Sequence, residues 1–134
     1  MQDAAADEVA AANRAYYAAL SARDLEAMAK VWEQSGEAIN IAPPIRPAAH
    51  VGWEAIRKNY EQFWVTLVHL RVAMNAPLIV ARGEIAWVYG IERTHRVARD
   101  GTESAGENHG ASVFVKNQGR WLMVFHQAAP NPAA

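Results

Sequence analysis

Hydrophobic positions recur at helical spacing in three stretches of the first half of the chain. The first stretch, from Asp3 to about Ala22, is rich in alanine and places four larger residues near one face, Val9, Asn13, Tyr16 and Leu20. The second, Asp24–Trp32, begins with a residue suited to a helix N-cap. The third, Gly52–Trp64, resumes the same period. These patterns predict three helices.

The segment between the second and third predicted helices combines a short apolar run with prolines. Ala38–Ala42 has the length and composition of a short strand. Pro43, Pro44 and Pro47 follow, and because proline cannot donate a backbone hydrogen bond they end any strand or helix there. We expect a short strand and then a loop that contains His50.

After Val65 the chain changes to long runs of residues that favour strands. Three short segments with turn chemistry separate these runs: Arg82–Gly83, Asp100–Gly101 and Asn117–Gly119. Strands joined by such short turns pair with their neighbours in antiparallel fashion. The second half therefore predicts a four-stranded antiparallel meander.

Two of these strands are apolar on both faces. Ile85–Ile91 and Trp121–Phe125 have hydrophobic residues at both parities, whereas a strand with one solvated face alternates. Three helices can cover only one face of a curved sheet in so small a domain, so we expect a second copy of the chain to cover the other. The alternative is a monomer whose outer face is screened by the long stems of Arg and Lys.

Composition narrows the range of functions. The chain has 134 residues, 51% of them hydrophobic, which suits one domain over residues 1–134. With 13 Lys and Arg against 14 Asp and Glu, it lacks the field that would hold nucleic acid or an acidic membrane. The absence of cysteine excludes disulfides, thiolate metal sites and cysteine nucleophiles. The acidic N-terminal residues and the lack of an apolar stretch of roughly 18 residues favour a cytoplasmic protein.

The order and spacing of four motifs resemble a known family. The motifs are Tyr16–Ala27, Val31–Trp32, Gly52–Ile56 and, above all, Gly119–Pro130. Together they resemble the nuclear-transport-factor-2-like fold, in particular its SnoaL-like polyketide cyclase and ketosteroid-isomerase-like members. The resemblance implies an α+β, cystatin-like conical barrel, in which a curved antiparallel sheet wraps around three N-terminal helices. It also implies an apolar pocket on the concave face and a homodimer formed through the convex face.

This chain matches the ketosteroid isomerases at some of their catalytic positions and has other residue types at the remaining ones. It places Tyr16 at the oxyanion-binding tyrosine, with Trp32 and Tyr60 where supporting tyrosines lie. Around the two carboxylate positions this chain has Ile39–Ala42, which contains Asn40, and His109–Ala111. Moving a proton at carbon requires a base at the substrate, so the sequence argues against ketosteroid isomerase activity.

Alternation along the strands suggests which side chains face the pocket. On one strand it groups Trp87, Tyr89, Ile91, Arg93 and His95, a face that the resemblance assigns to the pocket. The same reasoning turns five further residues inward, Glu107, His109, Val124, His126 and Ala128. Because imidazole titrates near neutral pH, His109 and His126 beside Tyr16 suit acid–base catalysis, as histidines and tyrosines do in scytalone-dehydratase-like members of the fold. Alternatively, each histidine only forms a hydrogen bond inside the cavity.

Other residues have a binding and a structural interpretation. Arg93 could hold an anionic ligand group or pair with Glu107. The aromatic residues, among them Trp32, Tyr60, Trp87 and Tyr89, could form ligand walls together with Asn40, or belong to an ordinary core. A metal site of His95, His109 and His126 lacks the close-spaced histidine pair that fixes two ligands on one element, so we expect no metal and no cofactor.

Three functions remain possible at this level. The first is a cofactor-independent lyase, isomerase or cyclase acting on a small hydrophobic carbonyl or phenolic compound, with Tyr16 as oxyanion donor and a histidine as acid or base. The second is a non-catalytic module that binds a ligand in the same pocket. The third is an association domain in which only the dimer surface matters. The sequence favours the pocket as the functional element and leaves catalysis open.

Overall fold

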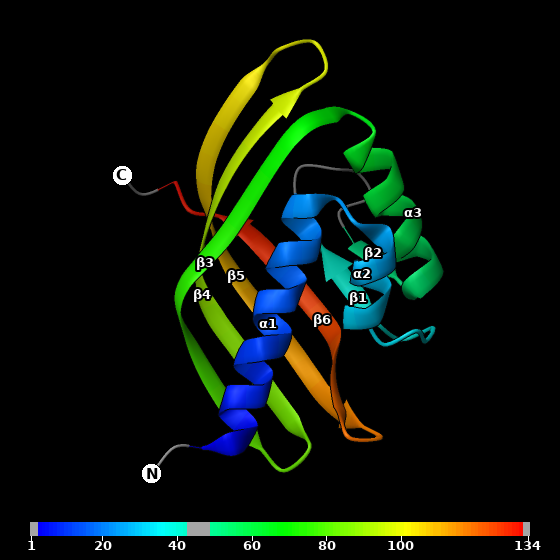
Figure 1. The fold of residues 1–134 in the computed structure, drawn as a ribbon, viewed down its shortest axis with the longest axis vertical. Helices are drawn as coiled ribbons and strands as arrows, with labels where there is room; N and C mark the ends of the chain where they lie inside the picture. Colours follow the sequence, from blue (N-terminus) through cyan, green and yellow to red (C-terminus); the bar gives the residue numbers. More distant parts are fainter. Residues whose placement is uncertain (1–2, 43–48, 133–134) are drawn as a thin grey trace.

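Three helices pack against one curved six-stranded sheet, which makes the chain an α+β protein (Figure 1). The computed structural model describes residues 3–42 and 49–132. Its elements are α1 (Ala4–Ala22), α2 (Leu25–Val31), β1 (Ile39–Ile41), β2 (Ala49–Val51), α3 (Trp53–Trp64), β3 (Leu67–Arg82), β4 (Ile85–Ala98), β5 (Glu103–Asn117) and β6 (Arg120–Pro130). The predicted fold class is confirmed. The predicted loop at Pro43, Pro44 and Pro47 lies outside the described residues.

Two of the three helices begin after an aspartate that caps them. Asp3 precedes α1 and its side chain accepts a hydrogen bond from the Ala5 amide at 3.0 Å. Asp24 precedes α2 in the same manner and accepts from the Ala27 amide at 3.0 Å. Each aspartate satisfies an amide that has no partner within its helix. The N-cap predicted for the second helix is therefore confirmed.

The sheet has the order β2-β1-β6-β5-β4-β3. Strands β3 to β6 form the predicted antiparallel meander, and β1 joins its edge by pairing parallel to β6. The three turns of the meander contain Gly83, Gly101 and Gly119, each with a positive φ that glycine adopts without strain. The sequence did not predict β2: His50 belongs to this three-residue strand, which pairs with β1, and not to a loop.

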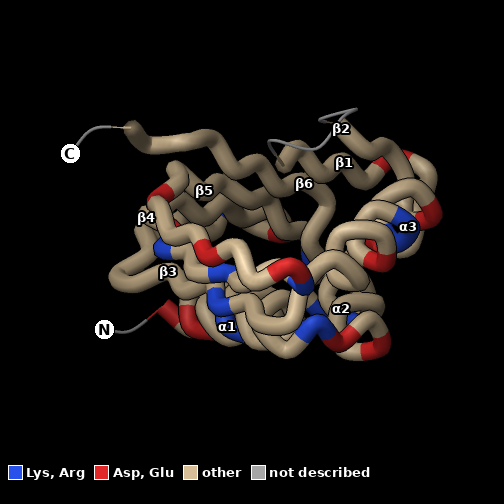
Figure 2. The backbone as a smooth tube through the Cα atoms, turned by 90° about the horizontal axis from the view of Figure 1, so that it is seen from above, with Lys and Arg blue, Asp and Glu red and all other residues tan. Residues whose placement is uncertain are grey.

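The concave face of the sheet and the helices enclose the core. Figure 1 shows α1 lying across the sheet, with α2 and α3 beside β1 and β2. The largest fully buried side chains come from both layers and include Met28, Trp32, Ile56, Phe114 and Met123. In Figure 2, Lys and Arg are interspersed with Asp and Glu over the molecule. No helix in the described part of the chain is long and apolar enough to cross a membrane.

The orientation of β4 differs from the one we predicted. Ala86, Val88 and Glu92 are buried on the concave face, whereas Trp87 and Tyr89 are 41% and 42% exposed on the other. Because β4 is apolar at both parities, alternation defines its two faces without indicating which one is inside. On the inner face, Met74 lies over Gly90, and Glu92 lies over Gly110.

Candidate active site

A cavity of about 400 Å³ lies between the concave face of the sheet and helices α1 and α3. Its apolar wall includes Leu20 from α1, Phe63 from α3, and Leu70 and Val72 from β3. Its polar groups come from six elements and include Tyr16, Asn40, Tyr60, Glu92 and His126. Apolar walls with a few convergent polar groups are typical of sites for small molecules.

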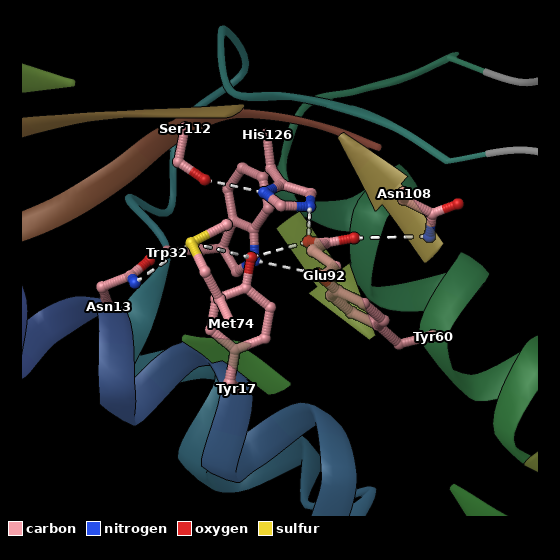
Figure 3. A network of polar contacts seen from close by, with 9 residues as sticks. All are labelled: Asn13, Tyr17, Trp32, Tyr60, Met74, Glu92, Asn108, Ser112 and His126. Atoms are coloured by element: carbon pink, nitrogen blue, oxygen red, sulfur yellow. Dashed lines mark hydrogen bonds and ion pairs between the residues drawn. The ribbon is translucent and has the colours of Figure 1, made fainter. Parts of the chain in front are cut away.

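Glu92 is the central polar residue of this cavity and is 2% exposed. Its Oε2 atom accepts a hydrogen bond from the Tyr17 hydroxyl at 2.6 Å and contacts His126 Nε2 at 3.1 Å. Its Oε1 atom accepts a longer hydrogen bond, 3.4 Å, from the Asn108 side-chain amide. Figure 3 shows these three partners converging on the carboxylate from α1, β6 and β5. Glu92 thus has one firmly held oxygen and one that is only weakly bound.

Strand pairing brings these partners together. Asn108 lies opposite Glu92 in the β4–β5 register, and His126 lies opposite Ser112 in the β5–β6 register. The Ser112 hydroxyl is 2.7 Å from His126 Nδ1, so both ring nitrogens have a protein partner and the ring orientation is fixed. Ser112 is buried but does not line the cavity, which excludes it as a nucleophile for a ligand bound there.

The site keeps its carboxylate ionised. Burial raises the pKa of Glu92, but hydrogen bonds from His126, Tyr17 and Asn108 and the electrostatic effect of His126 outweigh burial and leave the pKa below its ordinary value. Burial, followed by the neighbouring Glu92 carboxylate, raises the pKa of Tyr17, so this hydroxyl keeps its proton. At neutral pH Glu92 is therefore an ionised carboxylate, and Tyr17 is a protonated phenol that donates a hydrogen bond to it.

Two tyrosines supply further hydrogen-bond donors. Tyr16 is 3% exposed, and its ring centroid lies 4.8 Å from that of His126. Burial, followed by the proximity of Tyr60 and Glu92, raises the pKa of Tyr16 well above its usual range. Burial also raises the pKa of Tyr60, whose hydroxyl accepts a hydrogen bond from the Trp32 indole at 3.1 Å. Both phenols on the cavity wall are therefore protonated. Trp32 donates this hydrogen bond to Tyr60 but, contrary to our expectation, does not line the cavity.

Asn40 offers a hydrogen-bond acceptor. It lies opposite His126 in the parallel β1–β6 register and is 1% exposed. Its side-chain oxygen has no hydrogen-bond partner among residues 3–42 and 49–132. A buried polar atom without a partner is costly, so this oxygen is suited to a donor on a bound molecule.

Four candidate site residues that we predicted for the pocket lie on the outer face of the sheet, and so do Ile91 and His95, which alternate with the inward residues of β4. Trp87 and Tyr89 are there, and the Tyr89 hydroxyl is 2.7 Å from Nδ1 of His109. Arg93 pairs with Glu107 at 3.3 Å, and its side chain is 71% exposed. None of the four lines the cavity, because each occupies a position that alternates with the inward residues of its strand. His109 and His126 therefore cannot act on one ligand.

The histidines do not form a metal site. His95 contacts Glu103 at 2.5 Å, and its ring centroid is 5.1 Å from that of His69, away from His126. The part of the chain that the structure describes contains no group of three or more His, Asp or Glu residues suited to a metal ion.

The sequence analysis missed Glu92, the residue on which the site is centred. The available signal was a pattern of small residues: Gly90 and Gly110 lie opposite each other in the β4–β5 register. A Cβ atom at Gly110 would lie 2.7 Å from Cγ of Glu92, so the glycine provides the space for this carboxylate. Glycines in the interior of two neighbouring strands indicate a close approach of another group.

A match in sequence to a known domain family covers most of the chain. Residues 9–132 match the SnoaL-like domain. The chain belongs to the SnoaL-like family. The resemblance noted in the sequence is therefore confirmed, and with it the expectation of a pocket protein of this family. No curated protein matches the chain in sequence.

Solved structures with the same fold have different functional descriptions. A nuclear transport factor 2-like superfamily protein from Salmonella enterica superposes with a TM-score of 0.86 and 21% identity, covering 96% of this chain and 91% of that one. A candidate dehydratase of the nuclear-transport-factor-2-like family from Streptomyces avermitilis gives 0.83 and 17%, covering 95% and 96%. A candidate association domain of calcium/calmodulin-dependent protein kinase II from Xanthomonas campestris gives 0.78 and 20%, covering 95% and 88%. At these identities the likeness shows the fold alone.

A pair of alanine substitutions on one strand tests the packing around Glu92. We expect Gly110→Ala to destabilise this SnoaL-like protein by about 1–3 kcal/mol, because the new methyl group overlaps Glu92. Gly106→Ala is the matched control, since the nearest atom to its Cβ would be Thr94 Oγ1 at 3.9 Å. Urea unfolding of both variants measures the difference. Equal stability of the two variants would contradict the close packing of Glu92 on Gly110.

Proposed function

We propose that the cavity binds a small, largely apolar molecule bearing a carbonyl or hydroxyl group, and that Glu92 transfers a proton on it. The protein would then be a cofactor-independent lyase, isomerase or cyclase. The observation that carries this proposal is an ionised carboxylate on the wall of an apolar cavity, with one oxygen held by Tyr17 and His126 and the other only weakly bound. The acid–base role that we predicted for a histidine passes to Glu92.

The reaction begins with proton abstraction next to a carbonyl. Oε1 of Glu92 takes the proton from the carbon, the C–H electron pair forms a C=C bond, and the carbonyl electrons move to the oxygen. The Tyr16 hydroxyl, which keeps its proton, donates a hydrogen bond to the enolate oxygen. Return of this proton from Glu92 to another carbon gives an isomerase. In a lyase, the enolate electrons expel a hydroxyl group from the adjacent carbon, and this group takes the proton from Glu92 and leaves as water.

Ligand binding strengthens the base. In the free protein the three hydrogen bonds keep the pKa of Glu92 low. An apolar ligand that fills the cavity expels water from around Oε1, and loss of water disfavours the charged form of a carboxylate. The pKa of Glu92 therefore rises when the ligand binds, which brings it closer to the value that an effective base needs.

The remaining polar residues position the reacting groups. His126 and Tyr17 hold the Glu92 carboxylate in one orientation, and Ser112 holds the His126 ring. Asn40 accepts a hydrogen bond from a donor on the ligand, which fixes how the ligand lies against Glu92. Tyr60 extends the donor surface beside Tyr16.

Exchange of carbon-bound protons tests this proposal without knowledge of the natural substrate. The probe is 2-tetralone, a bicyclic apolar ketone, and the readout is the loss of its α-proton NMR signals in D₂O. We expect the native protein to accelerate this exchange and Glu92→Gln to lose about 100-fold or more of the acceleration. Glu103→Gln is the matched control, because Glu103 is exposed on the outer face and lies outside the cavity.

Two results would contradict catalysis by Glu92. One is a Glu92→Gln variant that shows a cooperative thermal unfolding transition and still accelerates the exchange of the 2-tetralone protons as much as the native protein does. The other is a native protein that binds 2-tetralone in calorimetry and gives no acceleration, which would favour the alternative of a non-catalytic binding module.

We further propose that a second copy of the chain covers the outer face of the sheet. The supporting observation is an apolar surface on adjacent strands, where Leu78 lies opposite Tyr89 in the register and both are exposed, by 61% and 42%. Trp87 and Ile85, 41% and 50% exposed, continue the same surface. Exposed apolar surfaces of this kind are typical of protein interfaces. The association-domain relative from Xanthomonas campestris shares this fold.

Sedimentation velocity tests the association. We expect the native protein to sediment as a dimer and Trp87→Glu as a monomer, because a charge would be buried without a partner in the interface. Val51→Glu is the control, since Val51 is 59% exposed on β2 at the far end of the sheet. A native monomer, or a dimer that Trp87→Glu leaves intact, would show that the outer face is not the interface.

A further inference from the structure

A second charged side chain on β4 lines the same cavity. Arg96 follows Glu92 by four residues and lies on the same face of the strand, with Thr94 between them. Its Nε atom donates to the Ser104 hydroxyl at 3.1 Å, and its guanidinium carbon lies 5.9 Å from the centroid of the Phe63 ring. These two contacts hold the guanidinium at the end of the cavity between α3 and β5.

Among the residues that the structure describes, the Arg96 guanidinium has no carboxylate partner. Arg96 forms no ion pair with any residue in the ranges 3–42 and 49–132. The two acidic residues that line the cavity are committed elsewhere: Glu92 to Tyr17 and His126, and Glu107 to Arg93. With only its Nε bonded, Arg96 keeps terminal N–H donors for a bound group.

The charges of Glu92 and Arg96 determine which group of a ligand lies at each end of the cavity. Glu92 is ionised and repels an anion at its own end, whereas Arg96 attracts one at the other. Four residues of extended strand place the two Cα atoms about 13 Å apart, and both side chains shorten the gap that a ligand must span. A single guanidinium matches a singly charged, planar carboxylate better than a doubly charged phosphate.

We propose that the ligand is a carboxylic acid whose carboxylate binds Arg96 and whose carbonyl or hydroxyl group lies at Glu92. Its apolar body spans the cavity along Phe63, Leu70 and Val72. This inference rests on the proposed function, because it takes the Glu92 end of the cavity as the site of reaction. It adds the chemical class of the ligand and the direction in which the ligand lies.

Three related naphthols separate these claims. 2-Naphthol has the hydroxyl group alone. 6-Hydroxy-2-naphthoic acid adds a carboxylate at the opposite end of the ring system, and 3-hydroxy-2-naphthoic acid adds it beside the hydroxyl group. Isothermal titration calorimetry at neutral pH measures each affinity. We expect the 6-hydroxy acid to bind about tenfold more tightly than 2-naphthol and the 3-hydroxy acid to gain nothing, since its carboxylate would meet Glu92.

Variants of two arginines identify the group responsible. Arg96→Gln should remove the tenfold gain of the 6-hydroxy acid and leave the affinity for 2-naphthol unchanged. Arg71→Gln removes the same charge from an exposed position on β3, outside the cavity, and should keep the gain. Arg96→Lys keeps the charge without the planar fork, so we expect it to retain part of the gain. Thermal melts show that each variant is folded.

The outcomes distinguish this inference from the proposed function. If 2-naphthol binds and the 6-hydroxy acid binds no better, or if both acids gain equally, the assignment of Arg96 is overturned while the proposed function stands. The same holds if Arg96→Gln keeps the gain. If none of the three compounds binds to the native protein, the proposed function and this inference both fall.

Discussion

The buried carboxylate of Glu92 is the group on which the arrangement of this site depends. A charge inside a protein is strongly unfavourable unless hydrogen bonds replace its lost hydration. Here Tyr17 from α1, Asn108 from β5 and His126 from β6 supply those bonds. The helix and three neighbouring strands are thus tied to one point, and the space for the carboxylate comes from Gly110.

The same strands use their two faces for different tasks. Alternation along β4 and β5 places Glu92, Asn108 and Arg96 towards the cavity, and Trp87 and Tyr89 towards the outside. Solved structures that share this fold carry different functional descriptions. Function in such a fold is therefore decided by the few polar side chains that reach the cavity.

The sequence predicts the fold more completely than the site, for physical reasons. Helical periodicity and local capping defined the helices, and glycine-containing turns defined the meander. The three-residue strand β2 was missed, because so short a strand has no period of its own and depends on pairing with β1. The inward face of β4 was assigned wrongly, because a strand that is apolar at both parities does not indicate which face is buried.

The errors in the predicted site follow from the wrongly assigned face of β4. Tyr16, Asn40, Tyr60 and His126, four of the candidate residues, line the cavity, and their roles there stay predictions. Apart from Gly90, the neighbours of Glu92 in sequence gave no signal of a buried carboxylate. Its partners lie on other elements, and only the three-dimensional pairing shows that a carboxylate at this position can be buried.

The most direct test of the central claim is the pKa of Glu92, measured by ¹³C NMR of its carboxyl carbon during a pH titration. The structure predicts a midpoint below the ordinary glutamate value of 4.5, because the hydrogen bonds to the carboxylate outweigh its burial. Stability linked to this group should then be present above the unfolded-state pKa and be lost as the pH falls through the folded-state pKa. A midpoint above 4.5 would contradict the account, because it would show that burial outweighs the hydrogen bonds of Tyr17, Asn108 and His126.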